Sequence, residues 1–250
     1  MTTTILVTGG TGGLGSHVVP LLAAHDVDIR ILTRHPRPDE GRVTYAAGDT
    51  VEGTGLAAAM AGADVVLHLA GGPKGDDVGT AHVVDAARAA GVGHVVMISV
   101  IGAEGMPIGY FRRKAEAERI LAAGGVPWTV LRAAQFHSFA YGMVRPMAKL
   151  PIVPVMKDVR LEPVAVQDVA ARLVELALGA PQGRVADLAG PEVRSLESLI
   201  DALPGRSRPH LRFGLPGAVG RAYRSEANLA GGTVQRGTGT WSEFLADQAA

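Results

Sequence analysis

The chain has 250 residues, of which 33 are glycine and none is cysteine, and its 24 basic side chains balance 24 acidic ones. The absence of cysteine excludes disulfide scaffolds, thiolate metal sites and cysteine nucleophiles. The neutral total argues against a protein that coats nucleic acid or an anionic membrane, so we expect neither among its partners.

Up to about residue 131, the sequence alternates between β-branched apolar runs and helical stretches. Strands are predicted at 5–7, 28–33, 43–47, 64–70, 94–99 and 126–131, and helices at 14–24, 56–60, 77–90 and 110–123. Buried strands that alternate with helices of this length form βαβ units. The pattern therefore predicts an α/β fold with a doubly wound parallel sheet and helices on both faces.

The remainder of the chain is less regular, because three prolines between residues 146 and 154 interrupt it. Strands are predicted at 160–166 and 184–189, and helices at 167–178, 195–203 and 241–249. No Pro/Ser-rich linker and no internal repeat divides the sequence. We therefore predict a single domain over residues 1–250, with the elements of a small C-terminal substrate lobe mainly at 135–160 and 190–235.

Three glycines follow the first predicted strand: Gly9, Gly12 and Gly15 form the pattern G-x-x-G-x-x-G. A bound dinucleotide needs a tight turn there, a close approach of the backbone to the pyrophosphate, and close packing of the helix on the strand. The helix N-terminus then offers N–H groups and a partial positive charge to the phosphates. A second copy of the pattern, at 214–220, contains a proline and follows no strong strand, so we predict a loop there.

With this order of elements, the loop resembles that of the short-chain dehydrogenase/reductase superfamily, and the atypical, NmrA-like branch of NAD(P)H-binding proteins fits best. Stretches 131–136, 163–170 and 188–191 are also similar to that branch. The resemblance covers nearly the whole chain and implies a Rossmann-like fold. The cofactor-binding residues that it implies around the first and fourth strands are Gly9, Thr11, Gly12, Gly13, Leu14, Gly15, Ala70, Gly71 and Gly72.

The end of the second predicted strand indicates which nucleotide binds. NAD enzymes of this class place an acidic residue there, whereas NADP enzymes place an arginine near the 2′-phosphate. Residues 32–37 include Thr33 and Arg34 but no carboxylate, so we expect both at the nucleotide and NADP(H) to be preferred over NAD(H). A merely solvated Arg34 is the alternative. Asp49 resembles the family's adenine-contacting acid, but it could equally cap the next turn.

Ser99 ends the fifth predicted strand, and Tyr110 and Lys114 follow with the spacing Tyr-x-x-x-Lys. The resemblance implies that the tyrosine exchanges a proton with the substrate oxygen, that the lysine binds the nicotinamide ribose and favours the tyrosinate, and that the serine hydrogen-bonds the substrate oxygen. Lys114 also falls on an apolar stripe of the predicted helix, with Ala117 and Leu121. A lysine on such a stripe is best explained by an anionic or cofactor partner. For Ser99, a hydrogen bond to the backbone is the alternative.

Phe136 and His137 follow the sixth predicted strand, at the edge of the sheet where ligands bind in such folds. We expect both to line the substrate pocket, although Phe136 could be a core residue and His137 a satisfied structural histidine. The eight histidines show no metal-ligand spacing, so we predict no metal site.

These features favour an NADPH-dependent oxidoreductase that reduces a small carbonyl or quinone by hydride transfer, with Tyr110 as the proton donor. The first alternative is a non-catalytic, NmrA-like redox sensor that binds NADP(H) and signals to a protein partner. A lesser alternative is a nucleotide-sugar epimerase or dehydratase. With no targeting segment in view, we expect a cytoplasmic protein acting on a small molecule. The sequence leaves the substrate and the oligomeric state open.

Overall fold

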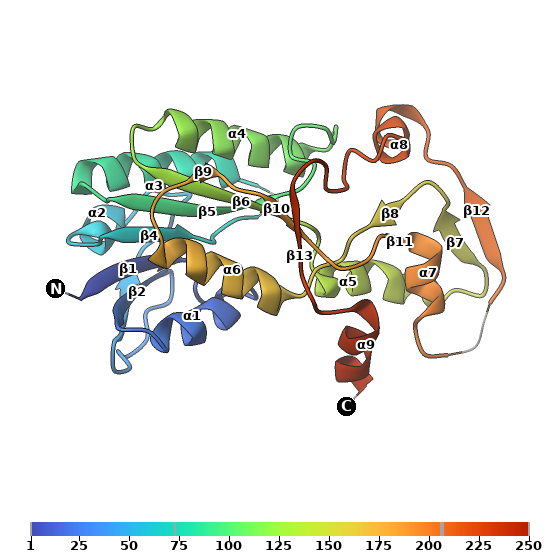
Figure 1. The fold of residues 1–250 in the computed structure, drawn as a ribbon, viewed down its shortest axis with the longest axis horizontal. Helices are drawn as coiled ribbons and strands as arrows, with labels where there is room; N and C mark the ends of the chain where they lie inside the picture. Colours follow the sequence, from blue (N-terminus) through green and yellow to red (C-terminus); the bar gives the residue numbers. More distant parts are fainter. Residues whose placement is uncertain (1, 73, 206–207, 250) are drawn as a thin grey trace. The chain divides into compact units, whose positions relative to one another are not determined.

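The computed structural model describes residues 2–72, 74–205 and 208–249 (Figure 1). The chain divides into two compact units, each built from three segments. Unit 1 contains Met1–Ser99, Arg112–Leu131 and Ala170–Val185, and unit 2 contains Val100–Phe111, Arg132–Val169 and Ala186–Ala250. The ranges 135–160 and 190–235, in which the sequence predicts the substrate lobe, fall in unit 2, with residues 206–207 outside the described part.

Unit 1 is built on a parallel sheet in the strand order β3-β2-β1-β4-β5-β6, and β9 lies beside β6. Its strands are β1 (Thr3–Thr8), β2 (Val27–Thr33), β3 (Val43–Ala47), β4 (Val65–His68), β5 (His94–Val100), β6 (Trp128–Ala133) and β9 (Gly183–Arg184). The chain leaves β3 at one edge and returns to β4 on the other side of β1. This reversal is a topological switch point, and ligands bind at the carboxyl ends of the strands beside it.

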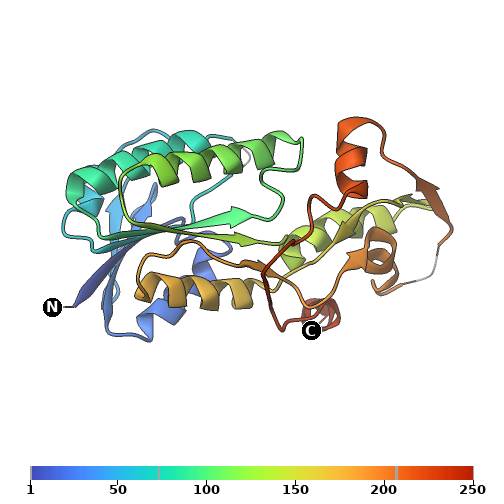
Figure 2. The ribbon, with the colours of Figure 1, turned by 45° about the horizontal axis from the view of Figure 1, so that its top comes forward.

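Helices cover both faces of this sheet, as Figures 1 and 2 show. They are α1 (Gly15–Ala23) and α6 (Val166–Leu178) on one face, and α2 (Leu56–Met60), α3 (Asp76–Ala90) and α4 (Gly109–Ala123) on the other. The α/β prediction of a doubly wound parallel sheet is therefore confirmed. No helix in the described residues is both long and apolar enough for a membrane crossing.

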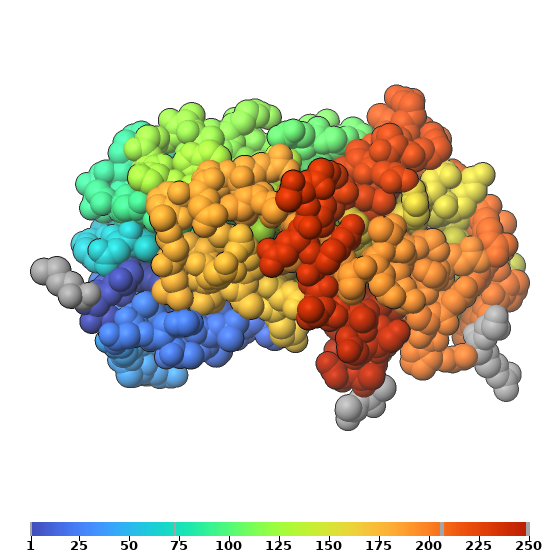
Figure 3. Space-filling view, in the orientation of Figure 1, coloured from blue at the N-terminus to red at the C-terminus, as the bar shows by residue number. Residues whose placement is uncertain are grey.

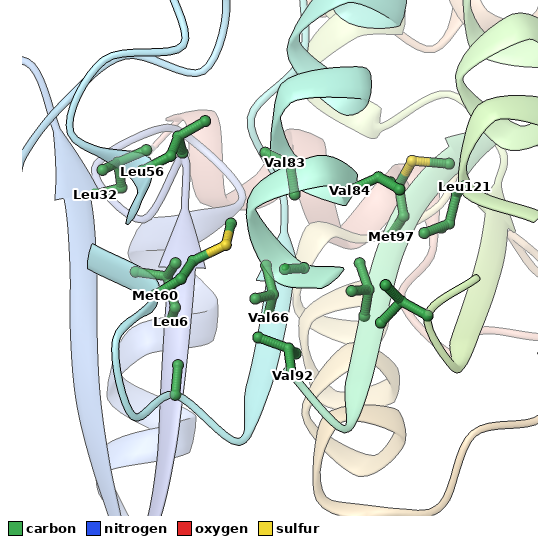
Figure 4. Packing of buried hydrophobic residues seen from close by; sticks show 14 of the residues in the cluster. Leu6, Leu32, Leu56, Met60, Val66, Val83, Val84, Val92, Met97 and Leu121 are labelled. Carbon is green, nitrogen blue, oxygen red and sulfur yellow. The ribbon is translucent and has the colours of Figure 1, made fainter. Parts of the chain in front are cut away.

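The core of unit 1 lies between the sheet and helices α2, α3 and α4 (Figure 4). Leu6, Val66 and Met97 come from the strands, and each is at most 1% exposed. Ala117 and Leu121 of α4 are fully buried against them. Because apolar side chains from adjacent strands and helices interdigitate here, the sheet is a rigid base for the loops at its carboxyl edge.

Unit 2 has its own core around Trp241, which is 1% exposed. Its helices are α5 (His137–Ala148), α7 (Leu196–Asp201), α8 (Gly217–Arg224) and α9 (Trp241–Ala249). Its strands are β7 (Val153–Met156), β8 (Arg160–Leu161), β10 (Asp187–Ala189), β11 (Arg194–Ser195), β12 (His210–Phe213) and β13 (Val234–Arg236). Helix α9 reaches the surface, where Figure 3 shows it in red.

Several predictions for this part of the chain need correction. The strand predicted at 160–166 is only β8, which ends at Leu161, and the strand predicted at 184–189 is divided between β9 and β10. The stretch 214–220, predicted as a loop, contributes its last residues to α8, for which Pro216 is the N-cap. A proline in that place is compatible with a helix start, because the first helical N–H groups have no partner within the helix. Helix α5 was not predicted, because Pro146 indicates an interruption of the chain. In the structure Pro146 lies in the last turn of α5 and does not break the helix.

Candidate functional site

The glycine loop between β1 and α1 has the close contacts that a dinucleotide fold requires. Gly9 has a φ of +72°, and a Cβ there would lie 2.6 Å from the backbone nitrogen of Ala70. A Cβ on Gly15 would lie 2.3 Å from the carbonyl oxygen of Gly9. Glycine is thus required at both positions by backbone approach, and Gly15 allows α1 to begin directly against the loop.

Helix α1 begins at this loop without a side-chain cap, because the residue at its N-cap position is Leu14. The amides of Ser16 and His17 donate to the carbonyls of Gly12 at 2.9 Å and Leu14 at 3.0 Å, and the helix dipole favours negative charge at this end. The amide of Gly12 also donates within the loop, to the carbonyl of Gly9 at 3.0 Å. This arrangement suits a phosphate or pyrophosphate.

A cleft of about 540 Å³ opens over the loop and the carboxyl ends of β1, β2 and β4, entirely within unit 1. All the expected cofactor-binding residues line the cleft except Gly15 and Lys114. Those that line it are Gly9, Thr11, Gly12, Gly13, Leu14, Thr33, Arg34, Asp49, Ala70, Gly71 and Gly72. Its size is typical of small-molecule and cofactor sites. The polar side chains that line the cleft, and the glycines that leave its backbone accessible, fit a dinucleotide.

Arg34 stands at the end of β2 with 74% of its side chain exposed, and its Nε lies 3.8 Å from Asp49 Oδ2. An ion pair this exposed is weak, so it holds the guanidinium only loosely. Asp49 in turn accepts hydrogen bonds from the amides of Val51 at 2.7 Å and Glu52 at 3.1 Å. Asp49 therefore caps the following turn, one of the two roles that the sequence left open, while it also lines the cleft.

Beneath the cleft, His68 at the end of β4 links three elements. Its Nδ1 lies 2.7 Å from Thr8 Oγ1 and its Nε2 lies 3.2 Å from Thr80 Oγ1, which donates to the carbonyl of Asp76. Burial, together with the nearby charge of Lys114, lowers the pKa of His68 to about 3. A neutral His68 must then donate from Nε2 to Thr80 and accept at Nδ1 from Thr8.

The three expected catalytic residues have different surroundings. Ser99, only 4% exposed, donates a short hydrogen bond from its Oγ to Glu118 Oε1. Lys114 is 6% exposed and lies 3.0 Å from Asp76 Oδ2, so its partner is a carboxylate of the same unit. Tyr110, on the first turn of α4, is 36% exposed and packs edge-on against Phe111.

Phe136 and His137 lie at the start of α5 in unit 2, where Phe136 is the N-cap residue. His137 is 4% exposed, and its ring packs against Trp241 and Phe244 at centroid distances of 5.8 and 5.3 Å. Burial lowers the pKa of His137. Its Nε2 is buried without a hydrogen-bond partner among the described residues, so the ring is not the satisfied structural histidine of the alternative interpretation.

Unit 2 also holds a cluster of three groups with metal-ligand chemistry among the described residues: Glu197, Asp201 and His210. Glu197 is already paired with Arg212, whose Nε donates to Oε2 at 3.0 Å. The hydrogen bonds from Arg212 and His210 lower the pKa of Glu197 to about 2. Since an arginine already neutralises this carboxylate, the cluster is better described as an ion-pair network.

Among the cleft residues that sequence reasoning missed, His68 and Asp76 have buried polar side chains. His68 lies in an apolar strand that the sequence predicts as buried, and a lone polar residue in such a run was the available signal. Asp76 carried no comparable signal, because its significance depends on Lys114, which is 38 positions later in the chain.

Comparison with known proteins gives matches over most of the chain. A family model described as NAD(P)H-binding matches residues 9–178. The (4-alkanoyl-5-oxo-2,5-dihydrofuran-3-yl)methyl phosphate reductase of Streptomyces griseus is 33% identical over 197 residues, which are 75% of this chain and 68% of that protein.

Two solved structures are similar over almost the full length. The NADPH-dependent quinone oxidoreductase of Escherichia coli, complexed with NADPH, has a TM-score of 0.80 at 21% identity and covers 98% of this chain and 100% of its own. A nucleoside-diphosphate-sugar epimerase from Staphylococcus aureus has a TM-score of 0.81 at 18% identity, with 97% and 99% covered. At such identities the likeness shows the fold alone, and the fold supports more than one chemistry.

Proposed function

Because the chain belongs to the NAD(P)H-binding family, as the match over residues 9–178 shows, we propose that it is an NADPH-dependent oxidoreductase. Its substrate in this proposal is a small carbonyl or quinone compound. The observation that carries the proposal is the cleft of unit 1, which joins an uncapped helix N-terminus to an exposed Arg34. The name of the Streptomyces relative, a reductase, supports the same class of reaction.

In this proposal the chain's own groups bind the cofactor at three places. The loop Gly9–Gly15 and the N-terminus of α1 hold the pyrophosphate, because their amides and the helix dipole favour phosphate oxygens. Arg34 pairs with the 2′-phosphate of NADP(H), for which its guanidinium has suitable geometry. The small residues from Ala70 to Gly72 let a ribose approach the backbone closely.

NADPH, when bound, supplies a hydride to the substrate carbon. The substrate oxygen then requires a proton, and we assign Tyr110 as its donor. Two features of this chain support the assignment: the Tyr-x-x-x-Lys spacing on α4, and the exposure of Tyr110, which lets its hydroxyl regain a proton from water.

The test is turnover of the Tyr110→Phe variant with a panel of carbonyl and quinone compounds, followed through NADPH consumption. General acid catalysis typically contributes a factor of about 10² to 10⁴, so we expect a loss of at least about a hundredfold with NADPH affinity retained. Tyr45→Phe, on β3, is the matched control and should keep full turnover. Full turnover by Tyr110→Phe would refute the role of the tyrosine.

One observation favours the sensor as the second candidate function. The Lys114 ammonium contacts Asp76, so part of its charge is already compensated before any substrate binds. A sensor needs only the nucleotide cleft and no proton donor. Absence of turnover over the whole panel, together with different affinities for NADPH and NADP⁺, would favour this function.

A further inference from the structure

Asp76 and Lys114 form a buried ion pair in unit 1, with side chains that are only 2% and 7% exposed. Asp76 is the first residue of α3, and Lys114 lies on α4. Burial of either charge alone would be very costly, so each requires the other. The pair therefore fixes where the ammonium of Lys114 lies.

The hydrogen-bonding capacity of this pair is incompletely used by the described residues. Lys114 Nζ donates to the carbonyl of Ile98 at 3.2 Å and lies 3.0 Å from Asp76 Oδ2. An ammonium has three donors, of which the carbonyl of Ile98 uses one. In the described part of the chain, neither carboxylate oxygen of Asp76 accepts a well-aligned hydrogen bond. A buried pair with unused donors and acceptors is unusual in a finished core.

The pair lies directly against Gly71, which lines the cofactor cleft. A Cβ on Gly71 would lie 2.6 Å from Asp76 Oδ1 and 3.0 Å from Lys114 Nζ. Residue 71 is glycine, so it places no side-chain atom between the Lys114 ammonium and the cleft.

We propose that Asp76 is a positioning residue for the cofactor: it holds the Lys114 ammonium beneath Gly71, from where the ammonium acts on a ribose hydroxyl of the bound dinucleotide. This inference rests on the proposed function only for the identity of the ligand. Asp76 acts through Lys114 and touches no reacting atom. The same glycine that admits the cofactor's ribose also leaves room for the pair beneath it.

The test uses Asp76→Asn in the full-length protein, with NADPH affinity measured by fluorescence titration at neutral pH. We expect affinity to fall about tenfold, as for the loss of one hydrogen bond from a charged group. Asp77→Asn is the matched control, since Asp77 lies on the same helical turn outside the cleft and should bind NADPH like the unmodified protein.

A double-mutant cycle with Lys114→Met separates this role from a purely structural one. If Asp76 acts through Lys114, adding Asp76→Asn to Lys114→Met should change NADPH affinity less than twofold, and it should restore thermal stability by removing the unpaired carboxylate. An Asp76→Asn variant with unchanged NADPH affinity overturns the inference, even if it is less stable. Failure of the unmodified protein to bind NADPH at all would instead refute the proposed function.

Discussion

The buried His68 makes a quantitative prediction for stability against pH. The side chain is 3% exposed, and both ring nitrogens are engaged by threonine hydroxyls. Burial, with a smaller contribution from the charge of Lys114, lowers its pKa from the ordinary 6.5 to about 3. In the unfolded chain the same imidazole takes up a proton near pH 6.5, so acid favours the unfolded state.

The sign and size follow from this difference in pKa. The native state binds no proton at His68 until the pH approaches 3, whereas the unfolded state binds one below about 6.5. The stability that depends on the neutral imidazole is therefore complete above pH 6.5 and is lost progressively as the pH falls toward 3. Between pH 7 and pH 5 the free energy of unfolding should decrease by about 2 kcal/mol through this residue alone.

The assay is urea unfolding at pH 7 and pH 5, comparing the unmodified protein with His68→Gln and His25→Gln. The first variant keeps one donor and one acceptor but cannot titrate, so its decrease on acidification should be smaller by about 2 kcal/mol. The exposed His25 is the control, and its replacement should leave the decrease unchanged. Equal decreases in the His68→Gln variant and the unmodified protein would refute the reasoning. The contributions of His94 and His137, whose pKa values burial also lowers, are common to all three proteins.

Two further predictions concern the cleft. Arg34→Glu should weaken NADPH binding by roughly tenfold to a hundredfold, because a charge-assisted contact is lost, and should leave NADH affinity nearly unchanged. Both affinities are measured by titration. Equal losses for the two nucleotides would contradict a 2′-phosphate contact. Gly15→Ala places a Cβ 2.3 Å from a carbonyl oxygen, whereas Gly13 has open space around it. Overpacking of this kind costs about 1–3 kcal/mol, so Gly15→Ala should lower Tm by roughly 5 °C and Gly13→Ala by much less in a thermal melt.

The sequence predicted unit 1 well because its signals are local. A buried parallel strand is a short apolar run, such as the one predicted at 94–99, which the structure reproduces as the fully buried β5. The glycine loop could be recognised for the same reason, since strand, turn and helix start follow one another within a few residues. Its requirements act on the backbone, so they restrict residue type at fixed positions.

Unit 2 was harder because its structure depends on distant pairings. Strand β12 pairs with β7 in parallel, so that His210 lies opposite Val153 across more than fifty intervening residues. No short-range pattern specifies such a partner. The prolines near β7 were read as interruptions, yet Pro154 lies within that two-stranded sheet, where a missing N–H is tolerated at an edge.

The candidate catalytic residues show which contacts cannot be inferred from the local sequence. The position of Lys114 on an apolar stripe required an anionic or cofactor partner, and the structure supplies an anion, Asp76, from another helix. Periodicity can state that a buried charge needs compensation, but it cannot state which group provides it, because the partner is chosen by packing between helices. The Tyr-x-x-x-Lys motif is therefore compatible with two roles for Lys114. In one the lysine acts on the tyrosine, and in the other it is paired with the carboxylate of Asp76. The response of cofactor affinity to the removal of Asp76 tests the second of these roles.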